Sequence, residues 1–515
     1  MARQVYVMVF DAGTGAGRCF ITDLKGRRTF ESYKEWAYDR PADVPGAKEF
    51  NSSEFWKILS QLARETMSKG GIDPSEIAAV TSTSQREGMV LLDKAGKEIY
   101  AGPNGDHRGT KESKAISRVL GDKIYQTSGH WPSSMFAPCR MEWLKKNKPQ
   151  VFGQVAHLLM INDWILYKLS GEYRSEPTNA CETALFDIHD LQWSWDVIKQ
   201  LEMPSSIFSN IQFPGQQVGE ISARAAEETG LREGTPVIMG ASDTQCGLLG
   251  SGVIQDNQIG IVAGTTTPVQ MVMPRPLIDP KCRMWTDCHV TPDKWVLESN
   301  VGDSGILYQW FRDSFCQAEQ AVAKSMGCSP YEIMNKESDS VEASTSHIFA
   351  FLGSEIMDVR GGGPEFGGFI MPSPGTIGNG TYEKGHFVRS VLESMAYAVR
   401  GNIEQIAELM PAKTAKVFVC GGSSSSNTWL KILCNVINIP VVVPETTEAT
   451  SIGAAICAAR GIGIYPDFES AIENMVHLKE PIIPNDRMAR EYDSLYQQWR
   501  MLYETLRKTN VSSNC

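Results

Sequence analysis

Short apolar stretches in the first quarter of the chain, bounded by turn residues, predict strands. Val5–Phe10 predicts a strand, and Arg18–Thr22 predicts its return strand across a glycine-rich turn. A second pair of strands is predicted at Ile77–Thr81 and Met89–Leu92. The N-terminus therefore reads as a β-meander followed by further paired strands.

The middle of the chain repeats this pattern about 250 residues later. Gln258–Ala263 predicts an apolar strand, the tight turn Gly264–Thr267 follows, and Val269–Val272 predicts the return strand. A similar hairpin at the start of each half indicates two related domains. We place them at residues 1–241 and 242–515.

Helices are predicted where apolar residues recur at helical spacing. Phe55–Gly70 is the first of them, with Ser52 or Ser53 as its cap. In the last third, helices alternate with strands; the predicted elements are the helices Arg389–Leu409, Thr428–Ile437, Glu448–Arg460 and Met488–Lys508 and the strands Val417–Cys420 and Val441–Val443. This alternation predicts an α/β fold.

Composition and charge indicate the broad class of protein. Hydrophobic residues make up 42% and charged residues 21%, which is ordinary for a globular protein. The net charge of −11 argues against binding of nucleic acid or of an anionic membrane surface. No stretch has the length of a signal-peptide core or a membrane helix, and the 12 cysteines form no CxxC pair. We therefore expect a cytoplasmic protein with reduced thiols.

Three turns offer donors for phosphate oxygens. In the first hairpin, Thr14 and Gly15 supply hydroxyl and backbone donors, and Arg18 supplies a cation. The turn Gly264-Thr265-Thr266 offers the same donors, and Gly421-Gly422-Ser423 lies between a strand and a helix, where open α/β sheets hold nucleotides. Each turn alone is explained as well by an ordinary loop. Their combination in this order favours phosphate binding.

Two carboxylates stand at the ends of predicted strands. Asp11 would be useful beside phosphates only if a cation such as Mg²⁺ lay between them. Asp243 follows the predicted strand Pro236–Gly240, where it could accept a proton from a substrate hydroxyl. The alternative is that Asp243 is a helix N-cap, and the residues alone favour the cap over the proton acceptor.

The ordered set of motifs resembles the FGGY carbohydrate kinases over nearly the whole chain. Arg140 departs from that pattern, since lysine is usual there. The motifs, in chain order, are Asp11-x-Gly13-Thr14, Gln85-Arg86-Glu87, Asn104-x-Asp106-x-Arg108, Gly240-x-x-Asp243, Gly264-Thr265-Thr266, and Gly421-Gly422-Ser423 followed by Glu448 and Gly453-Ala454-Ala455.

The resemblance implies an actin-like, ribonuclease H-like fold of two domains with ATP and Mg²⁺ in the cleft between them. It makes Asp243 the general base, and Asp11 and Asp243 the residues that face Mg²⁺. The ATP contacts it implies are Thr14, Gly15, Arg18, Gly264, Thr265, Thr266, Gly421, Gly422, Ser423 and Asn427.

The acceptor that the resemblance implies is a small polyol or keto-polyol. Gln85, Arg86, Glu87, Asn104 and Asp106, together with Asp243, are its expected contacts, because these side chains exchange hydrogen bonds with hydroxyl and carbonyl oxygens. A surface ion pair is the alternative interpretation of Arg86 and Glu87.

Within the family, the likeness is greatest to the autoinducer-2 kinases, which act on the open-chain 4,5-dihydroxy-2,3-pentanedione. A xylulose or ribulose kinase and a glycerol kinase are the alternatives. A non-catalytic, nucleotide-dependent regulator with the same fold belongs to another class, which would need no polar substrate loop at residues 85–87. A homodimer is also possible within the resemblance.

Overall fold

The meander predicted at the N-terminus forms one edge of a seven-stranded sheet in the computed structural model, which describes residues 5–342, 347–373, 382–411 and 414–509. The strand order is β10-β11-β4-β1-β2-β3, with β12 beside β4. β1 is antiparallel to β2 and parallel to β4. The bounds are β1 Tyr6–Ala12, β2 Ala16–Asp23, β3 Thr29–Glu35, β4 Ile77–Ser84, β10 Gln217–Glu220, β11 Pro236–Ile238 and β12 Ala241–Ser242.

A second sheet of six strands repeats this arrangement in the later part of the chain. Its order is β15-β16-β14-β13-β19-β20, in which β13 is antiparallel to β14 and parallel to β19. The relation of β13, β14 and β19 thus matches that of β1, β2 and β4, as the paired hairpins predict. The bounds are β13 Ile259–Val262, β14 Thr266–Met273, β15 Trp285–Cys288, β16 Trp295–Asp303, β19 Val417–Cys420 and β20 Val441–Val442.

The predicted pairing of Ile77–Thr81 with Met89–Leu92 is wrong. Met89–Leu92 is strand β5, and it pairs with β6 and β7 in a separate three-stranded sheet. The chain leaves β4 at a turn in which Glu87 has a φ of 58°, so the backbone is redirected before β5 begins. The remaining strands are β6 Glu98–Gly102, β7 His157–Met160, β8 Phe186–Asp187, β9 Gln192–Trp193, β17 Phe349–Phe351 and β18 Gly368–Ile370.

The helices predicted from helical spacing are present, with ends shifted by a few residues, whereas the 19-residue helix Thr110–Ser128 and several shorter helices are not among those predicted. The first helix begins at Ser52, but its cap is Asn51 rather than Ser52 or Ser53, because the Asn51 side chain accepts a hydrogen bond from the Glu54 N–H at 3.1 Å. The helices are α1 Ser52–Gly70, α2 Thr110–Ser128, α3 Ala137–Asn147, α4 Pro149–Phe152, α5 Ile161–Ser170, α6 Pro177–Ala180, α7 Trp195–Gln200, α8 Ala223–Thr229, α9 Asp243–Leu249, α10 Gly305–Phe315, α11 Gln317–Met326, α12 Pro330–Asp339, α13 Lys384–Leu409, α14 Asn427–Ile437, α15 Ala449–Gly461, α16 Phe468–Met475 and α17 Asp486–Lys508. Within the described ranges, no helix combines the length and apolar character needed to cross a bilayer.

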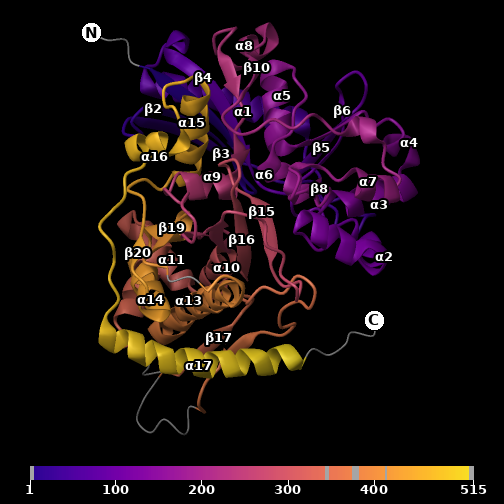
Figure 1. Ribbon diagram of the computed structural model, residues 1–515. Coiled ribbons are helices and arrows are strands. Elements are labelled where there is room, and N and C mark those ends of the chain that lie inside the picture. The colour runs from indigo at the N-terminus through magenta and orange to yellow at the C-terminus, as the bar shows by residue number, and fades with distance from the viewer. Residues whose placement is uncertain (1–4, 343–346, 374–381, 412–413, 510–515) are drawn as a thin grey trace.

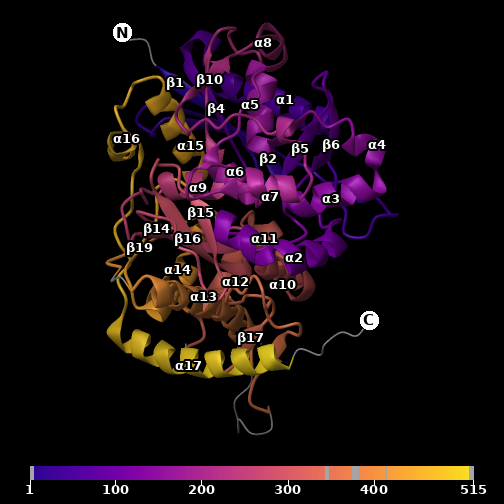
Figure 2. The same ribbon diagram turned by 45° about the vertical axis from the view of Figure 1, so that its right-hand side comes forward.

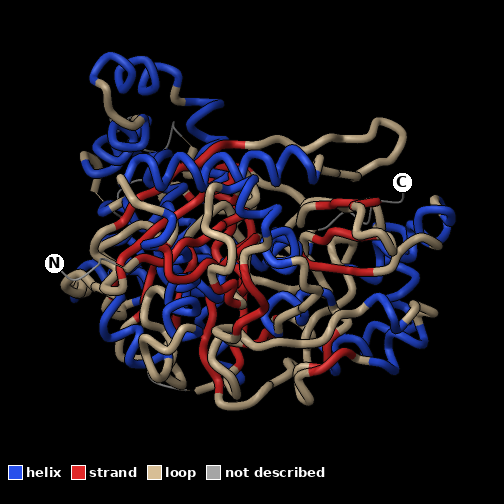
Figure 3. Tube along the Cα trace, turned by 90° about the horizontal axis from the view of Figure 1, so that it is seen from above, coloured by secondary structure: helices blue, strands red, loops and turns tan. Residues whose placement is uncertain are grey.

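Helices cover both faces of the first sheet (Figures 1 and 3). Alternate residues of β1 point to opposite faces, so Met8 and Phe10 pack with α1 and α5, whereas Val7 and Val9 pack with α15. The second sheet packs on α13 and α14, and α17 crosses the base of the molecule (Figure 2). The fold therefore has two layered α/β units in one chain.

The helix α15 follows the strands of the second sheet in the chain but covers the first sheet. It lies unusually close to α9. A Cβ atom at Gly453 would stand 1.9 Å from the backbone oxygen of Cys246, and one at Gly250 would stand 1.8 Å from that of Ala449. The Thr450 hydroxyl also donates to the backbone oxygen of Asp243 at 3.3 Å. Because α9 begins with Asp243, this contact fixes the position of that carboxylate.

We predict that Gly453→Ala separates α9 from α15. The added methyl group cannot be accommodated by a side-chain movement, because the atom it meets belongs to the backbone. Overpacking of this kind costs about 1–3 kcal/mol in the free energy of unfolding, measurable by urea denaturation. Gly368→Ala is the matched control, since a Cβ atom there would meet nothing within 4 Å. Equal unfolding midpoints for the two variants would contradict the prediction.

Candidate functional site

A cavity of about 480 Å³ lies between the two sheets, a size within the range of small-molecule sites. Residues from both halves of the chain line it. Nine of the residues singled out from the sequence are among them: Thr14, Gly15, Arg86, Glu87, Asn104, Asp243, Gly264, Thr265 and Thr266. The fold thus brings these nine residues together from positions up to 252 apart, from Thr14 to Thr266.

The two predicted hairpins face this cavity from opposite sheets. In the first, the Gly13 N–H donates to the Ala16 carbonyl at 3.0 Å, and Asn104 Nδ2 donates to the Thr14 hydroxyl at 3.0 Å. In the second, the Gly264 N–H donates to the Thr266 carbonyl at 3.0 Å. These turns are held by their own backbone bonds, which leaves hydroxyl groups and further N–H groups for a ligand.

Asp243 is the first residue of α9 and lines the cavity. Its Oδ1 accepts a hydrogen bond from the Thr244 N–H at 2.7 Å, and no described residue donates to Oδ2. Burial raises the pKa of Asp243 to about 6, and Arg86 opposes that rise. At neutral pH the group is therefore chiefly a carboxylate. It serves the first turn of the helix with one oxygen, and it has a second oxygen for a ligand.

Asp11 and Arg18 lie beside the cavity rather than in its lining. Burial raises the pKa of Asp11 to about 7; Arg18 lowers it, and the negative charge of Asp243 raises it further. Arg18 Nη1 lies 3.7 Å from Asp11 and also pairs with Glu448, next to the start of α15. Asp11 and Asp243 repel each other and lie beside groups that can donate hydrogen bonds to phosphate oxygens, so a cation fits between them.

Gln85 is 1% exposed and holds two loops together behind the first hairpin. Its Nε2 donates to the Gly13 carbonyl at 3.2 Å and to the Tyr38 hydroxyl at 2.9 Å, while its Oε1 accepts from the Asn104 N–H at 3.0 Å. The structure therefore places Gln85 next to the cavity lining, where it positions Asn104.

Asp106 is not brought into the cavity. It is fully buried, and its carboxylate accepts hydrogen bonds from Arg108 Nε at 2.8 and 3.0 Å, from the Lys48 N–H at 3.1 Å and from the Tyr100 hydroxyl. All of these donors belong to the protein itself, so in this structure the side chain orders its own loop and lies outside the cavity lining.

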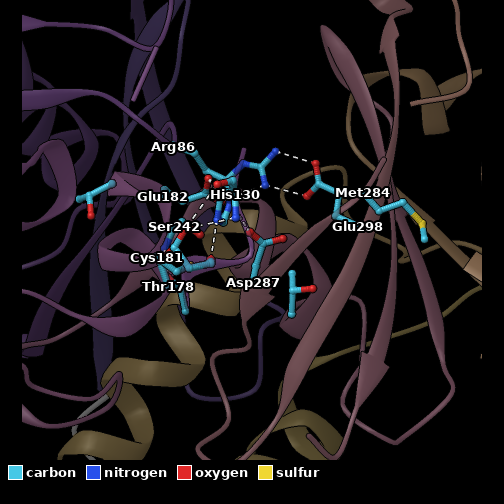
Figure 4. A network of polar contacts seen from close by, with 12 residues as sticks. Arg86, His130, Thr178, Cys181, Glu182, Ser242, Met284, Asp287 and Glu298 are labelled. Atoms are coloured by element: carbon cyan, nitrogen blue, oxygen red, sulfur yellow. Dashed lines mark hydrogen bonds and ion pairs between the residues drawn. The ribbon is translucent and has the colours of Figure 1, made fainter. Parts of the chain in front are cut away.

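Arg86 reaches from the first sheet to the second (Figure 4). Its Nη1 and Nη2 donate to the two carboxylate oxygens of Glu298 at 2.7 and 2.9 Å, and Nη1 also lies 3.0 Å from Glu182. Arg86 is 8% exposed, whereas both carboxylates are fully buried. The alternative interpretation of Arg86 as part of a surface ion pair is therefore wrong, because its partners are buried and come from distant parts of the chain.

Glu87 lines the cavity in a left-handed backbone conformation, which a non-glycine residue rarely adopts. Burial raises the pKa of its carboxyl group well above the usual range, and Glu182 adds to this. The buried Arg140 donates to the backbone oxygens of Glu87 and, at 3.1 Å, of Pro103. Arg140 thus holds the two loops that carry Glu87 and Asn104.

The third glycine cluster lies at the end of β19. Gly421 has a φ of 88°, a 3₁₀ helix covers Gly422–Ser425, and α14 starts at Asn427. The Ser423 N–H donates to the Ala263 carbonyl at 3.0 Å, next to Gly264. This cluster is outside the lining of the central cavity, but it adjoins the second hairpin at the same edge of the sheet.

Sequence reasoning missed several polar residues that line the cavity or support it. Trp285, Asn300 and Glu355 line it, and Glu182 and Glu298 hold Arg86. A signal was present for Glu298, since it directly follows the apolar run Trp295–Leu297 within the same strand. A buried charge within a strand needs a partner, which is a reason to look for one.

Comparisons with known proteins agree with this arrangement. Residues 6–250 match the N-terminal domain of the FGGY family of carbohydrate kinases, and residues 259–462 match its C-terminal domain. The chain is 32% identical over 502 residues to proteins named autoinducer-2 kinase from Yersinia enterocolitica and Yersinia pestis, covering 97% of this chain and 94% of each relative.

Solved structures show the fold. A gluconate kinase from Lactobacillus acidophilus matches with a TM-score of 0.86 at 18% identity, over 98% of this chain and 99% of that one. A ligand-bound xylulose kinase from the same organism matches with 0.85 at 18%, with the same coverage, and a Plasmodium falciparum glycerol kinase with ADP matches with 0.81 at 17%, over 97% and 98%. These matches confirm the predicted actin-like, two-domain sugar kinase fold.

The two family matches together cover most of the chain, and their order is that of the two sheets that enclose the cavity. Kinases of this family use ATP and phosphorylate an alcohol group of their substrate. The chain therefore belongs to the FGGY family of carbohydrate kinases.

Proposed function

We propose that this kinase transfers the γ-phosphoryl group of ATP to the terminal hydroxyl of 4,5-dihydroxy-2,3-pentanedione, with Asp243 as general base. The observation that carries the proposal is the shared cavity of Asp243, Arg86, Glu87 and the two threonine hairpins. The identity to relatives named autoinducer-2 kinase over nearly the full length supports the choice of substrate.

Asp243 supplies the proton acceptor. Its Oδ2 takes the proton of the substrate hydroxyl. The substrate oxygen then forms a bond to the γ-phosphorus as the bond from that phosphorus to the β,γ-bridging oxygen breaks and ADP leaves. The pKa of about 6 suits this task at neutral pH, because the group is ionised and still basic. The Thr244 N–H holds Oδ1, which fixes the direction of the free oxygen.

The hairpins bind and orient the phosphates. Thr14 with Gly15, and Thr265 with Thr266 after Gly264, present donors from opposite sides of the cavity. Such donors stabilise the charge that develops on the phosphoryl oxygens. Gly421, Gly422, Ser423 and Asn427 would then hold the adenosine beside the second hairpin.

Asp11 and Asp243 fit Mg²⁺ as its protein ligands, because hard cations take carboxylate oxygens and the two groups repel each other without one. When bound, Mg²⁺ offsets the negative charge of the triphosphate. Arg18 then balances Asp11 and Glu448 at the back of the hairpin.

The substrate oxygens would be held by Arg86, Glu87 and Asn104, which line the cavity near Asp243. Gln85 and Arg140 position them from behind. A pentulose kinase or a glycerol kinase is the alternative, and the experiments below separate them. The domain boundary at 241/242, a cytoplasmic location and a homodimer stay predictions.

We predict that Asp243→Asn lowers turnover by about 10²- to 10⁴-fold, the usual value of a general base. ATP binding, measured by calorimetry, should remain because the hairpins are unchanged. Asp256→Asn, which alters an exposed carboxylate paired with Lys294, is the control and should leave both quantities unchanged. Normal turnover by Asp243→Asn would remove this residue from the role of base.

The substrate is tested by a coupled assay of ADP release. We expect the largest kcat/KM with the pentanedione, and lower values with xylulose, ribulose, erythritol and glycerol. Arg86 lines the cavity and can donate to carbonyl oxygens, of which the pentanedione has two, the two pentuloses one each, and erythritol and glycerol none. Water alone should give the slowest release. A pentulose or glycerol as the preferred acceptor would replace the proposed substrate and keep the proposed chemistry.

Removal of divalent cations should abolish turnover. With EDTA, Asp11 and Asp243 are left facing the triphosphate without a balancing charge, so both ATP affinity and turnover should fall, and Mg²⁺ should restore them. Asp11→Asn should raise the Mg²⁺ concentration needed for half-maximal activity. An unchanged Mg²⁺ requirement in this variant would exclude Asp11 from the metal site.

A further inference from the structure

A buried polar cluster outside the reaction centre joins the two halves of the molecule. Residues 128–130 dock on strand β15 of the second sheet: the Thr286 N–H donates to the Gly129 carbonyl at 3.3 Å, and the Tyr125 hydroxyl donates to the Met284 carbonyl at 2.6 Å. A Cβ atom at Gly129 would stand 2.3 Å from the Thr286 backbone oxygen, so the approach is close. These contacts place His130 beside Asp287 of β15 (Figure 4).

The His130 ring is oriented by its other nitrogen. Nδ1 lies 2.8 Å from the Ser128 carbonyl oxygen, which can only accept, so Nδ1 carries a hydrogen and donates it. In the neutral ring, Nε2 then has a lone pair for whatever it faces; burial favours this form, whereas Asp287 and Glu182 raise the pKa of His130 well above its usual value and favour a proton there. It lies 2.9 Å from an Asp287 oxygen and 3.4 Å from a Glu182 oxygen, and all three residues are fully buried. A ring nitrogen and two carboxylates that face one point need a positive charge there, which either a proton on Nε2 or a metal ion can supply.

Four buried atoms at this point have no hydrogen-bond partner among the described residues: both carboxylate oxygens of Asp287, Oε2 of Glu182 and Nε2 of His130. A proton on Nε2 is the competing occupant. However, the Asp287 oxygen at 2.9 Å lies off the direction in which a ring N–H would point, because the contact does not have hydrogen-bond geometry.

The nearby cation Arg86 does not supply the missing charge. Its bidentate contact is with Glu298, which also accepts hydrogen bonds from Gln270 at 2.6 Å and Asn300 at 2.9 Å. Arg86 further occupies only the other oxygen of Glu182. Three buried carboxylates, those of Glu182, Asp287 and Glu298, thus share the single positive charge of Arg86. About two negative charges are left over, an arrangement that is costly unless further positive charge balances it.

We propose that His130, Glu182 and Asp287 bind one structural divalent transition-metal ion, of which Zn²⁺ fits the donor set best. One ligand atom from each residue lies within 4.8 Å of the others. Ligand atoms about 2.1 Å from one ion stand roughly 3.0 Å apart at right angles and roughly 3.4 Å apart at the tetrahedral angle. The two Nε2–oxygen distances of 2.9 and 3.4 Å lie close to these values.

The surroundings resemble those of metal sites in general, where a ligating histidine donates its other N–H to a backbone carbonyl and ligating carboxylates receive outer hydrogen bonds. Here the Ser128 carbonyl and Arg86 fill these places. His130 and Glu182 belong to the first half of the chain and Asp287 to the second, so the ion would link the two halves. This inference does not depend on the proposed substrate.

The test is the zinc content of the full chain. Because the site is buried, the ion must enter during folding, so the protein is produced with Zn²⁺ in the growth medium and then freed of loosely held metal with EDTA. Elemental analysis should find one Zn²⁺ per chain, and none in Asp287→Asn or His130→Gln. His289→Gln is the matched control, since His289 is also buried but Nε2 contacts the Val253 carbonyl at 3.1 Å; it should retain the ion.

A second measurement keeps the proposal falsifiable if those variants fold poorly. Anomalous diffraction at the zinc edge from wild-type crystals should place one peak between His130, Glu182 and Asp287. A wild-type chain without zinc, or a peak elsewhere, would overturn the proposal and leave a proton or a water molecule as the occupant. Zinc content equal in wild type and Asp287→Asn, with both folded by circular dichroism, would also overturn it.

Discussion

The close approach of α9 to α15 is the constraint on which the site depends. It is possible only because Gly453 and Gly250 have no Cβ atom where the two backbones meet. α15 also packs on the first sheet through its small, buried residues, while α9 carries Asp243 into the cavity. A helix from the end of the chain therefore positions the carboxylate relative to strands at its beginning, and a larger side chain at either glycine would move it.

A second constraint is electrostatic. The cavity lies between sheets whose facing surfaces carry buried carboxylates, among them Glu182, Asp287 and Glu298, and one buried guanidinium, Arg86. Burial of such charges is tolerated only where partners are close and well oriented. Arg86 provides this for Glu298, and hydrogen bonds from Gln270 and Asn300 complete it. For the same reason, the buried carboxylates of Glu182 and Asp287 beside His130 need further positive charge.

Much of the site could be predicted from local sequence. Glycine and threonine in a strand–turn–strand segment specify a hairpin with free donors, so Thr14, Gly264 and Thr265 were identifiable without a structure. Asp106 shows the limit of this reasoning. It shares one motif with Asn104, yet its carboxylate accepts hydrogen bonds from Arg108, Tyr100 and the Lys48 backbone. Those partners come together only in the fold, so the sequence could not separate the two roles.

The sequence by itself determined most of the long helices, the paired hairpins and the family, because each of their motifs rests on residues that are close in the chain and act through local geometry. Only the tertiary structure decided that Met89–Leu92 leaves the main sheet, that Arg86 pairs with Glu298, and that His130 meets Asp287. The physical reason is that these contacts join segments up to 212 positions apart. Their energies depend on burial and distance, which no local pattern of residues records.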